Sequence, residues 1–201
     1  MTTAKDLFII AMDPQPDHPV GQGDLSLALA GAELIDLIGA QVVTLDGDSI
    51  VPGGPWESDD RLLGEASAAL TRQVPYERVE DWLWRRGRDL AAAYQAALEA
   101  DGELTRGRGG RSFFGAERVE LADSPALHQA RHRWEADEPV LAALAAVVGV
   151  QSGPPEEELD LDDEAVTTVL AIVNDAVMEL EAVRQRRSIE KAAFANVWRA
   201  P

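Results

Sequence analysis

The stretch at positions 24–39, DLSLALAGAELIDLIG, constrains the fold more than any other part of the chain. Its apolar residues recur three or four positions apart, which predicts an amphipathic helix. The predicted inward face consists of Leu25, Ala28, Leu29, Ala32, Ile35 and Ile38. Asp24 can cap the start of this helix, and Gly39 suits its end. This is the clearest helical pattern in the N-terminal half.

A β-hairpin is predicted directly after this helix. Positions 41–55, QVVTLDGDSIVPGGP, carry two short β-favouring runs on either side of an Asp46-Gly47 turn signal. The same order returns later, because positions 88–100, RDLAAAYQAALEA, predict a helix that ends near Gly102. The glycine-rich stretch TRGRGGRSFFG, at 105–115, then predicts the tip of a second hairpin.

The remaining patterns are mostly helical. The apolar run DLFIIAMD at 6–13 fits a short helix or a buried strand. Further helices are predicted to open at Ser58, at Pro75, at Asp137-Glu138-Pro139 and at about Glu164. The predicted fold is therefore mainly α, a single compact helical domain with short β-hairpins that spans residues 1–201.

Composition supports this fold and a cytoplasmic location. Aromatic residues make up only 5% of the chain, which favours closely packed helices over an aromatic-rich β-sandwich. Cysteine is absent, which excludes disulfides and thiol catalysis and favours a reducing compartment. The N-terminal apolar run is too short for a signal peptide, and no stretch reaches the roughly 18 apolar residues of a membrane span.

Charge and motifs argue against several functions. The formal net charge of −18 repels nucleic acid unless bases gather on one face, so no nucleic-acid partner is expected. His128 and His132 are four residues apart, but no third metal ligand is evident. The acidic stretch ELDLDDE at 158–164 lacks the glycine and distal glutamate of an EF-hand. No nucleophile elbow, phosphate loop or dinucleotide fingerprint occurs, so neither an enzyme, a metal nor a cofactor is predicted.

Arginine clusters are the strongest candidates for a binding site. They are Arg85, Arg86 and Arg88; Arg106, Arg108 and Arg111; Arg131 and Arg133; and Arg184, Arg186, Arg187 and Lys191. If several converge, they can hold a phosphate or an anionic headgroup while Phe113 and Phe114 enter the interface. Alternatively, each cluster balances nearby acids or solvates a helix end, and the two phenylalanines fold back onto the core.

The order of these segments resembles the Golgi phosphoprotein 3 family, whose members occur in eukaryotes and in actinobacteria. DLFIIAMD and LALAGAELIDLIGAQVVTLDGDSIV look like its N-terminal helix and its small-residue helix with the following hairpin. LLGEASAAL, VEDWL and the helix ending LEADGEL look like its central part. The resemblance covers most of the chain and suggests a bacterial, actinobacterial member. It implies a nonenzymatic peripheral membrane protein that binds phosphatidylinositol 4-phosphate.

The resemblance also implies where a lipid headgroup would bind. Of the two family arginines in the helix before the second hairpin, one falls on Arg88 and the other on Ala91. The family arginine of the small-residue helix falls on Ala30, and no aromatic residue occurs around Gly21, where the family has a tryptophan. Arg85 and Arg86 are expected to replace part of the missing charge.

The second hairpin, with Arg106, Arg108, Arg111, Phe113 and Phe114, corresponds to the family's membrane-contacting and self-association element. The leading hypothesis is thus a cytoplasmic protein that binds anionic phospholipid at the inner face of a membrane. The alternative is a protein-interaction adaptor that has lost phosphoinositide binding and contacts protein partners.

Overall fold

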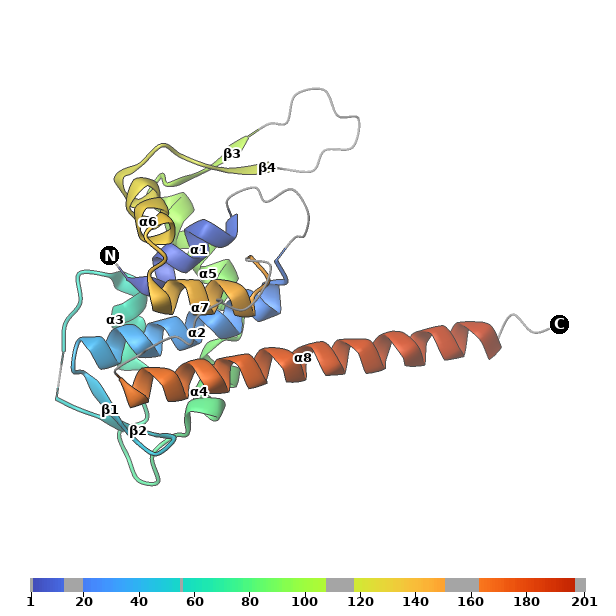
Figure 1. Ribbon diagram of the computed structural model, residues 1–201, viewed down its shortest axis with the longest axis horizontal. Helices are drawn as coiled ribbons and strands as arrows, with labels where there is room; N and C mark the ends of the chain where they lie inside the picture. Colours follow the sequence, from blue (N-terminus) through green and yellow to red (C-terminus); the bar gives the residue numbers. More distant parts are fainter. Residues whose placement is uncertain (1, 13–19, 55, 108–117, 151–162, 198–201) are drawn as a thin grey trace.

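The computed structural model describes residues 2–12, 20–54, 56–107, 118–150 and 163–197, which form eight α-helices and two β-hairpins (Figure 1). The helices are α1 (Thr3–Met12), α2 (Gln22–Gly39), α3 (Arg61–Ala68), α4 (Val79–Arg86), α5 (Leu90–Ala100), α6 (Pro125–Glu135), α7 (Pro139–Val147) and α8 (Glu164–Val197). The strands are β1 (Val43–Asp46), β2 (Ser49–Pro52), β3 (Leu104–Gly107) and β4 (Arg118–Leu121). The mainly α fold with short hairpins is confirmed.

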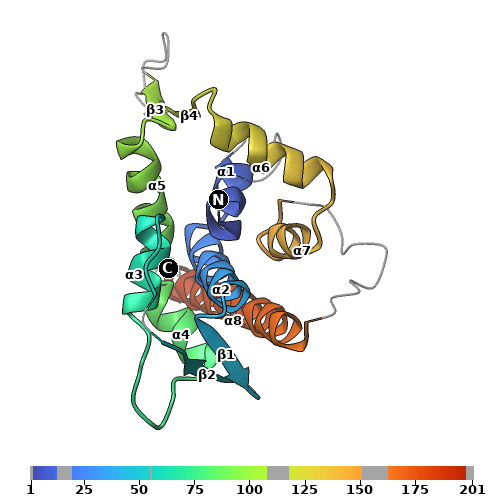
Figure 2. The same ribbon diagram turned by 90° about the vertical axis from the view of Figure 1, so that its left-hand side faces the viewer.

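Helix α2 lies at the centre of the molecule and contacts α1, α3, α4, α5, α7 and α8 (Figures 1 and 2). It is buried on almost every side from Leu25 to Ile35, so it is not the amphipathic helix that its periodicity predicts. Small residues make this burial feasible because they let neighbouring helices approach closely. At Gly31, an added Cβ would lie 2.3 Å from Val173 Cγ2 of α8.

The first hairpin matches its prediction. Asp46 pairs with Ser49, which leaves Gly47 and Asp48 as a two-residue loop, and Gly47 has the positive φ of 60° that such loops require. The hairpin is joined to the start of α4, because Ile50 N donates to Glu77 O and Val79 N donates to Asp48 O. These bonds fix the first hairpin against the start of α4.

The second hairpin pairs Leu104 with Leu121 through to Gly107 with Arg118, and Ala122 N donates a hydrogen bond to Glu103 O just outside these strands. Its predicted tip, with Arg108, Arg111, Phe113 and Phe114, lies outside the described residues. The hairpin follows α5 through Gly102, whose φ of 73° confirms the predicted left-handed end of that helix.

Several helix boundaries differ from the sequence predictions. Residues 6–12 belong to a helix and not to a strand. Asp24 does not cap α2, which starts after Gly21. The cap of α3 is Asp60 and not Ser58, because Asp60 accepts a hydrogen bond from Leu63 N. Helix α4 begins at Val79, four residues after the predicted Pro75.

Two predicted helix starts are confirmed. Glu138 caps α7 by accepting a hydrogen bond from Leu141 N, with Pro139 in the first turn. Helix α8 begins at Glu164 and is the longest element, with 34 residues. Within the described ranges, none of the helices is both long enough and apolar enough to cross a membrane.

Candidate functional site

The turn between α4 and α5 is held tightly against the first turns of α2. At Gly87, an added Cβ would lie 2.5 Å from Leu83 O and 3.1 Å from Ser26 O, so only glycine fits there without a shift. The Ser26 hydroxyl, on buried α2, accepts a hydrogen bond of 3.1 Å from Ala91 N of α5. These contacts fix the backbone on both sides of Arg88.

A surface pocket of about 410 Å³ opens beside this turn. Its walls come from the start of α2, from the end of α4, from the start of α5 and from the middle of α8. The residues that matter for recognition are Ser26, Trp84, Arg88, Asp89 and Leu180. The pocket thus combines an arginine, an aromatic ring, a hydroxyl and the carboxylate of Asp89, which is not bonded to the arginine.

Arg88 is exposed and has no hydrogen bond or ion pair with any part of the chain that the structure describes. Its guanidinium therefore remains open to an external anion. Trp84 is 37% exposed, whereas Trp82, two residues earlier, is fully buried. Two residues along a helix face in nearly opposite directions, which explains why one ring reaches the pocket and the other reaches the core.

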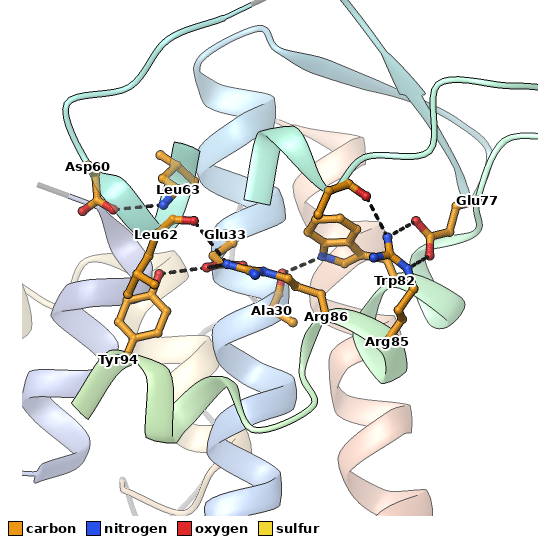
Figure 3. Close-up of polar contacts among 11 residues, drawn as sticks. Ala30, Glu33, Asp60, Leu62, Leu63, Glu77, Trp82, Arg85, Arg86 and Tyr94 are labelled. Carbon is orange, nitrogen blue, oxygen red and sulfur yellow. Dashed lines mark hydrogen bonds and ion pairs between the residues drawn. The ribbon is translucent and has the colours of Figure 1, made fainter. Parts of the chain in front are cut away.

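Trp82 is part of the core beneath the pocket. Its indole Nε1 donates a hydrogen bond of 3.0 Å to Ala30 O of α2 (Figure 3). Ala30 is fully buried, and Ala91 is only 1% exposed. Two of the three positions on which the resemblance places family arginines, Ala30 and Ala91, are therefore interior positions here.

Arg86 forms a buried ion pair with Glu33 of α2 (Figure 3). Its Nε lies 2.7 Å from Glu33 Oε2 and its Nη2 lies 2.9 Å from Oε1, a two-point contact. Tyr94 donates a further hydrogen bond to the same carboxylate, and Leu62 O accepts one from Arg86. Burial raises the pKa of the Glu33 carboxyl, while the bonds from Arg86 and Tyr94 oppose that rise.

Arg85 points away from Arg86 and pairs with Glu77 (Figure 3). Its Nε and Nη2 each lie 2.6 Å from a carboxylate oxygen, and its guanidinium stands 5.2 Å from the centre of the Trp82 ring. The hydrogen bond and charge of Glu77 raise the pKa of Arg85 further above its usual value. Neither Arg85 nor Arg86 lines the pocket around Arg88.

A second arginine stands at the edge of the pocket. Arg184 of α8 places Nη1 2.8 Å and 2.6 Å from the two carboxylate oxygens of Asp24. This pair links the start of α2 to α8, and Leu180 lies one turn before it. The sequence prediction for Asp24 missed this role because the two residues are 160 positions apart.

The other predicted clusters fall in different places. Arg133 pairs with Glu138 at 3.0 Å and with the buried Asp6, which joins α6 to α7 and α1. Arg106 belongs to β3, away from the pocket. His128 Nε2 lies 2.8 Å from Asp123 Oδ1, and no group of three metal-ligating side chains occurs in the described parts of the chain.

Sequence reasoning found Arg88 but missed Trp84 and Leu180. The WLWRR segment at 82–86 did carry a signal for Trp84, because two tryptophans at that spacing cannot both face the core of one helix. Leu180 was expected to point inward, and it is half-buried at the pocket wall. The lipid-binding roles predicted for Arg85, Arg86 and Arg88 stay predictions.

Comparison with known proteins gives a family. No curated protein matches the chain. A family model described as Golgi phosphoprotein 3 (GPP34) matches residues 4–191, which is nearly the whole sequence. The chain belongs to the Golgi phosphoprotein 3 (GPP34) family.

Proposed function

We propose that this protein binds the headgroup of an anionic phospholipid in the pocket beside the α4–α5 turn. Phosphatidylinositol 4-phosphate is the headgroup that the family resemblance suggests. The protein acts without catalysis and associates peripherally with a membrane from the cytoplasmic side. Family membership supports a lipid- or protein-binding role of this kind.

The observation that carries the proposal is that Arg88 lines the pocket and has no ion-pair partner among the described residues. It is the pocket residue on which the resemblance places a headgroup ligand, and it has no carboxylate partner within the described residues. Arginine recognises phosphate through paired, charge-assisted hydrogen bonds, which are stronger than neutral ones. By contrast, the charges of Arg85 and Arg86 are balanced by Glu77 and Glu33.

Trp84 supplies the aromatic group of the proposed site. The family has a tryptophan near the position of Gly21, and here the ring comes from α4 and lines the same pocket. An aromatic side chain next to a cation suits a polyhydroxylated ring that carries phosphate. The ring of the ligand can pack on the indole of Trp84 while the guanidinium of Arg88 neutralises the phosphate. The second hairpin, whose predicted tip contains Phe113 and Phe114, is proposed to make a further contact with the membrane or with another subunit.

Arg88→Gln and Trp84→Ala test the proposal. Loss of a charge-assisted hydrogen bond should weaken binding roughly tenfold or more. The measurement is co-sedimentation with vesicles of neutral lipid, of phosphatidylinositol and of phosphatidylinositol 4-phosphate, each at two salt concentrations. Arg72→Gln is the matched control, because Arg72 is also exposed and its Nη1 bonds only to Gly53 O at 3.0 Å.

The proposal is wrong if native protein binds phosphatidylinositol 4-phosphate no better than other lipid at equal vesicle charge. It is also wrong if Arg88→Gln binds as Arg72→Gln does.

The alternative function is that of an adaptor that contacts proteins and has lost phosphoinositide binding. The interior positions of Ala30 and Ala91 favour it, because two of the family's arginine ligands have no equivalent in the pocket. Protein partners that remain bound when membranes are removed, together with no vesicle binding, would support this alternative.

A further inference from the structure

Helix α8 extends far beyond the rest of the molecule (Figure 1). Its first half packs on the body through Val166, Val169, Val173 and Ala176, which are all buried. Val183 and Arg184 are half-buried, and every residue from 185 to 191 is exposed. The second half of α8 therefore leaves the body next to the pocket and has no partner in the described structure.

One face of this projecting helix is basic. Arg184, Arg187 and Lys191 follow Leu180 by four, seven and eleven positions, a spacing that keeps all of them on one side of a helix. We call Arg184, Arg187 and Lys191 the basic stripe. Because Leu180 lines the pocket and Arg184 stands at its edge, the basic stripe starts at the pocket and runs outward.

The distance along the stripe exceeds the size of one headgroup. A helix rises about 1.5 Å per residue, so Lys191 stands about 16 Å along α8 from Leu180. A headgroup held by Arg88 cannot reach Lys191. Arg187 and Lys191 are exposed and make no hydrogen bond or ion pair with the described residues, so they remain available to other anions.

The stripe also differs in charge from the chain around it. Residues 184–191, RQRRSIEK, hold four bases and one acid, although the whole chain has a net charge of −18. The opposite face of α8 carries the exposed apolar side chains Met178 and Ile189, which are 64% and 69% exposed. Between Arg184 and Lys191, where the structure describes the side chains, the basic face carries no exposed apolar residue, so a contact made there is electrostatic.

We propose that the basic stripe binds the surface of an anionic membrane around the lipid whose headgroup occupies the pocket. The proposal rests on the proposed function for the identity of its partner. Arg88 selects one headgroup, and Arg187 and Lys191 meet neighbouring anionic lipids through long-range attraction. Helix α8 then lies along the membrane surface and sets the orientation of the protein.

The double variant Arg187→Gln/Lys191→Gln tests this role. Each basic residue close to an anionic surface contributes enough that the loss of two should weaken vesicle binding roughly 25-fold. Arg61→Gln/Arg72→Gln is the control, since it removes the same charge from exposed positions away from α8. Binding is measured with two kinds of vesicle: neutral lipid alone, and neutral lipid with added phosphatidylserine and phosphatidylinositol 4-phosphate. It is also measured with a water-soluble, short-chain phosphatidylinositol 4-phosphate that forms no vesicle.

The stripe variant should lose vesicle binding and keep native affinity for the short-chain lipid, whereas the control should keep both. The difference should disappear at about 1 M salt, where the Debye length falls to about 3 Å. Equal vesicle binding by the stripe variant and the control overturns the proposal. So does a loss that appears equally with the short-chain lipid.

A different set of binding results would contradict the proposed function and leave the role of the basic stripe intact. If native protein ignores the short-chain lipid but its vesicle binding still depends on Arg187 and Lys191, the stripe is a membrane contact and the pocket is not a headgroup site. Salt-sensitive self-association that the stripe variant abolishes, with no vesicle binding, would overturn the membrane proposal and assign the stripe to an acidic protein surface.

Discussion

The Glu33 carboxylate is a charged group in the interior and needs bonding partners there. It is fully buried, and its charge is tolerated because Arg86 and Tyr94 both bond to it. Removing one partner of such a pair leaves the other charge without compensation, which costs far more than the intact pair contributes. The pair also fixes α4 against α2, directly below the turn that presents Arg88.

Glu33→Gln should therefore destabilise the protein strongly. The amide keeps a similar shape but leaves the 15% exposed Arg86 unpaired, and the expected loss is about 3 kcal/mol in the free energy of unfolding. Urea denaturation measures this loss. The matched variant Glu33→Leu/Arg86→Met/Tyr94→Phe removes all three polar groups together and should lose less than Glu33→Gln alone. A larger loss in the triple variant would contradict this account.

At the scale of single elements, the contact of α2 with α8 depends on Gly31. Helical glycine is normally unfavourable by about 1 kcal/mol relative to alanine. Here an added methyl group would stand 2.3 Å from Val173 Cγ2, and Val173 is fully buried. Overpacking of a core costs about 1–3 kcal/mol, which exceeds the gain in helix propensity.

Gly31→Ala should lower the thermal stability, and Gly64→Ala should not. Gly64 is also inside a helix, but its added Cβ would meet only Ser58 Cβ at 3.9 Å, so Gly64→Ala should gain up to about 1 kcal/mol. Thermal unfolding of both variants separates close packing from propensity. Equal gains in the two variants would show that α2 and α8 can move apart at no cost.

The elements also show what the sequence could and could not predict. Local signals were sufficient for the β1–β2 turn at Gly47, for the end of α5 at Gly102 and for the start of α7 at Glu138. The burial of α2 on all sides was not predictable from its own periodicity, because it depends on which helices surround it. Likewise, the local sequence around Asp24 predicted a helix cap, and it could not show that Arg184 of α8 pairs with this residue.

The same limit applies to the candidate site. Arg88 could be predicted as a headgroup ligand because the family resemblance aligned it with a family arginine. Arg85 and Arg86 were predicted to add to its charge, and local sequence could not show that Glu77 and Glu33 pair with them, since Glu33 is 53 positions from Arg86. The pocket exists only because four helices meet, so its aromatic wall at Trp84 depends on tertiary structure.

For the whole molecule, buried carboxyls and a large negative charge act together on stability. Burial raises the pKa of Asp6, Glu33 and Asp36 above the usual carboxyl range. As the pH rises through the interval between the unfolded and folded pKa values, the folded state holds more protons than the unfolded state, so stability falls. The net charge of −18 adds self-repulsion in the same direction, because it grows as carboxyls ionise.

The free energy of unfolding should therefore be higher at about pH 5 than at about pH 8, measured by urea denaturation at each pH. High salt should reduce only the part that comes from surface repulsion, because buried groups are poorly screened. Asp36→Asn removes one of the three carboxyls with a raised pKa, so the stability of this variant should change less with pH than that of the native protein. Asp36 also accepts hydrogen bonds from Thr3 N and Ala4 N at the start of α1, so the variant should be less stable at every pH. Stability that rises from about pH 5 to about pH 8 would mean that the bonds to these carboxylates outweigh their burial.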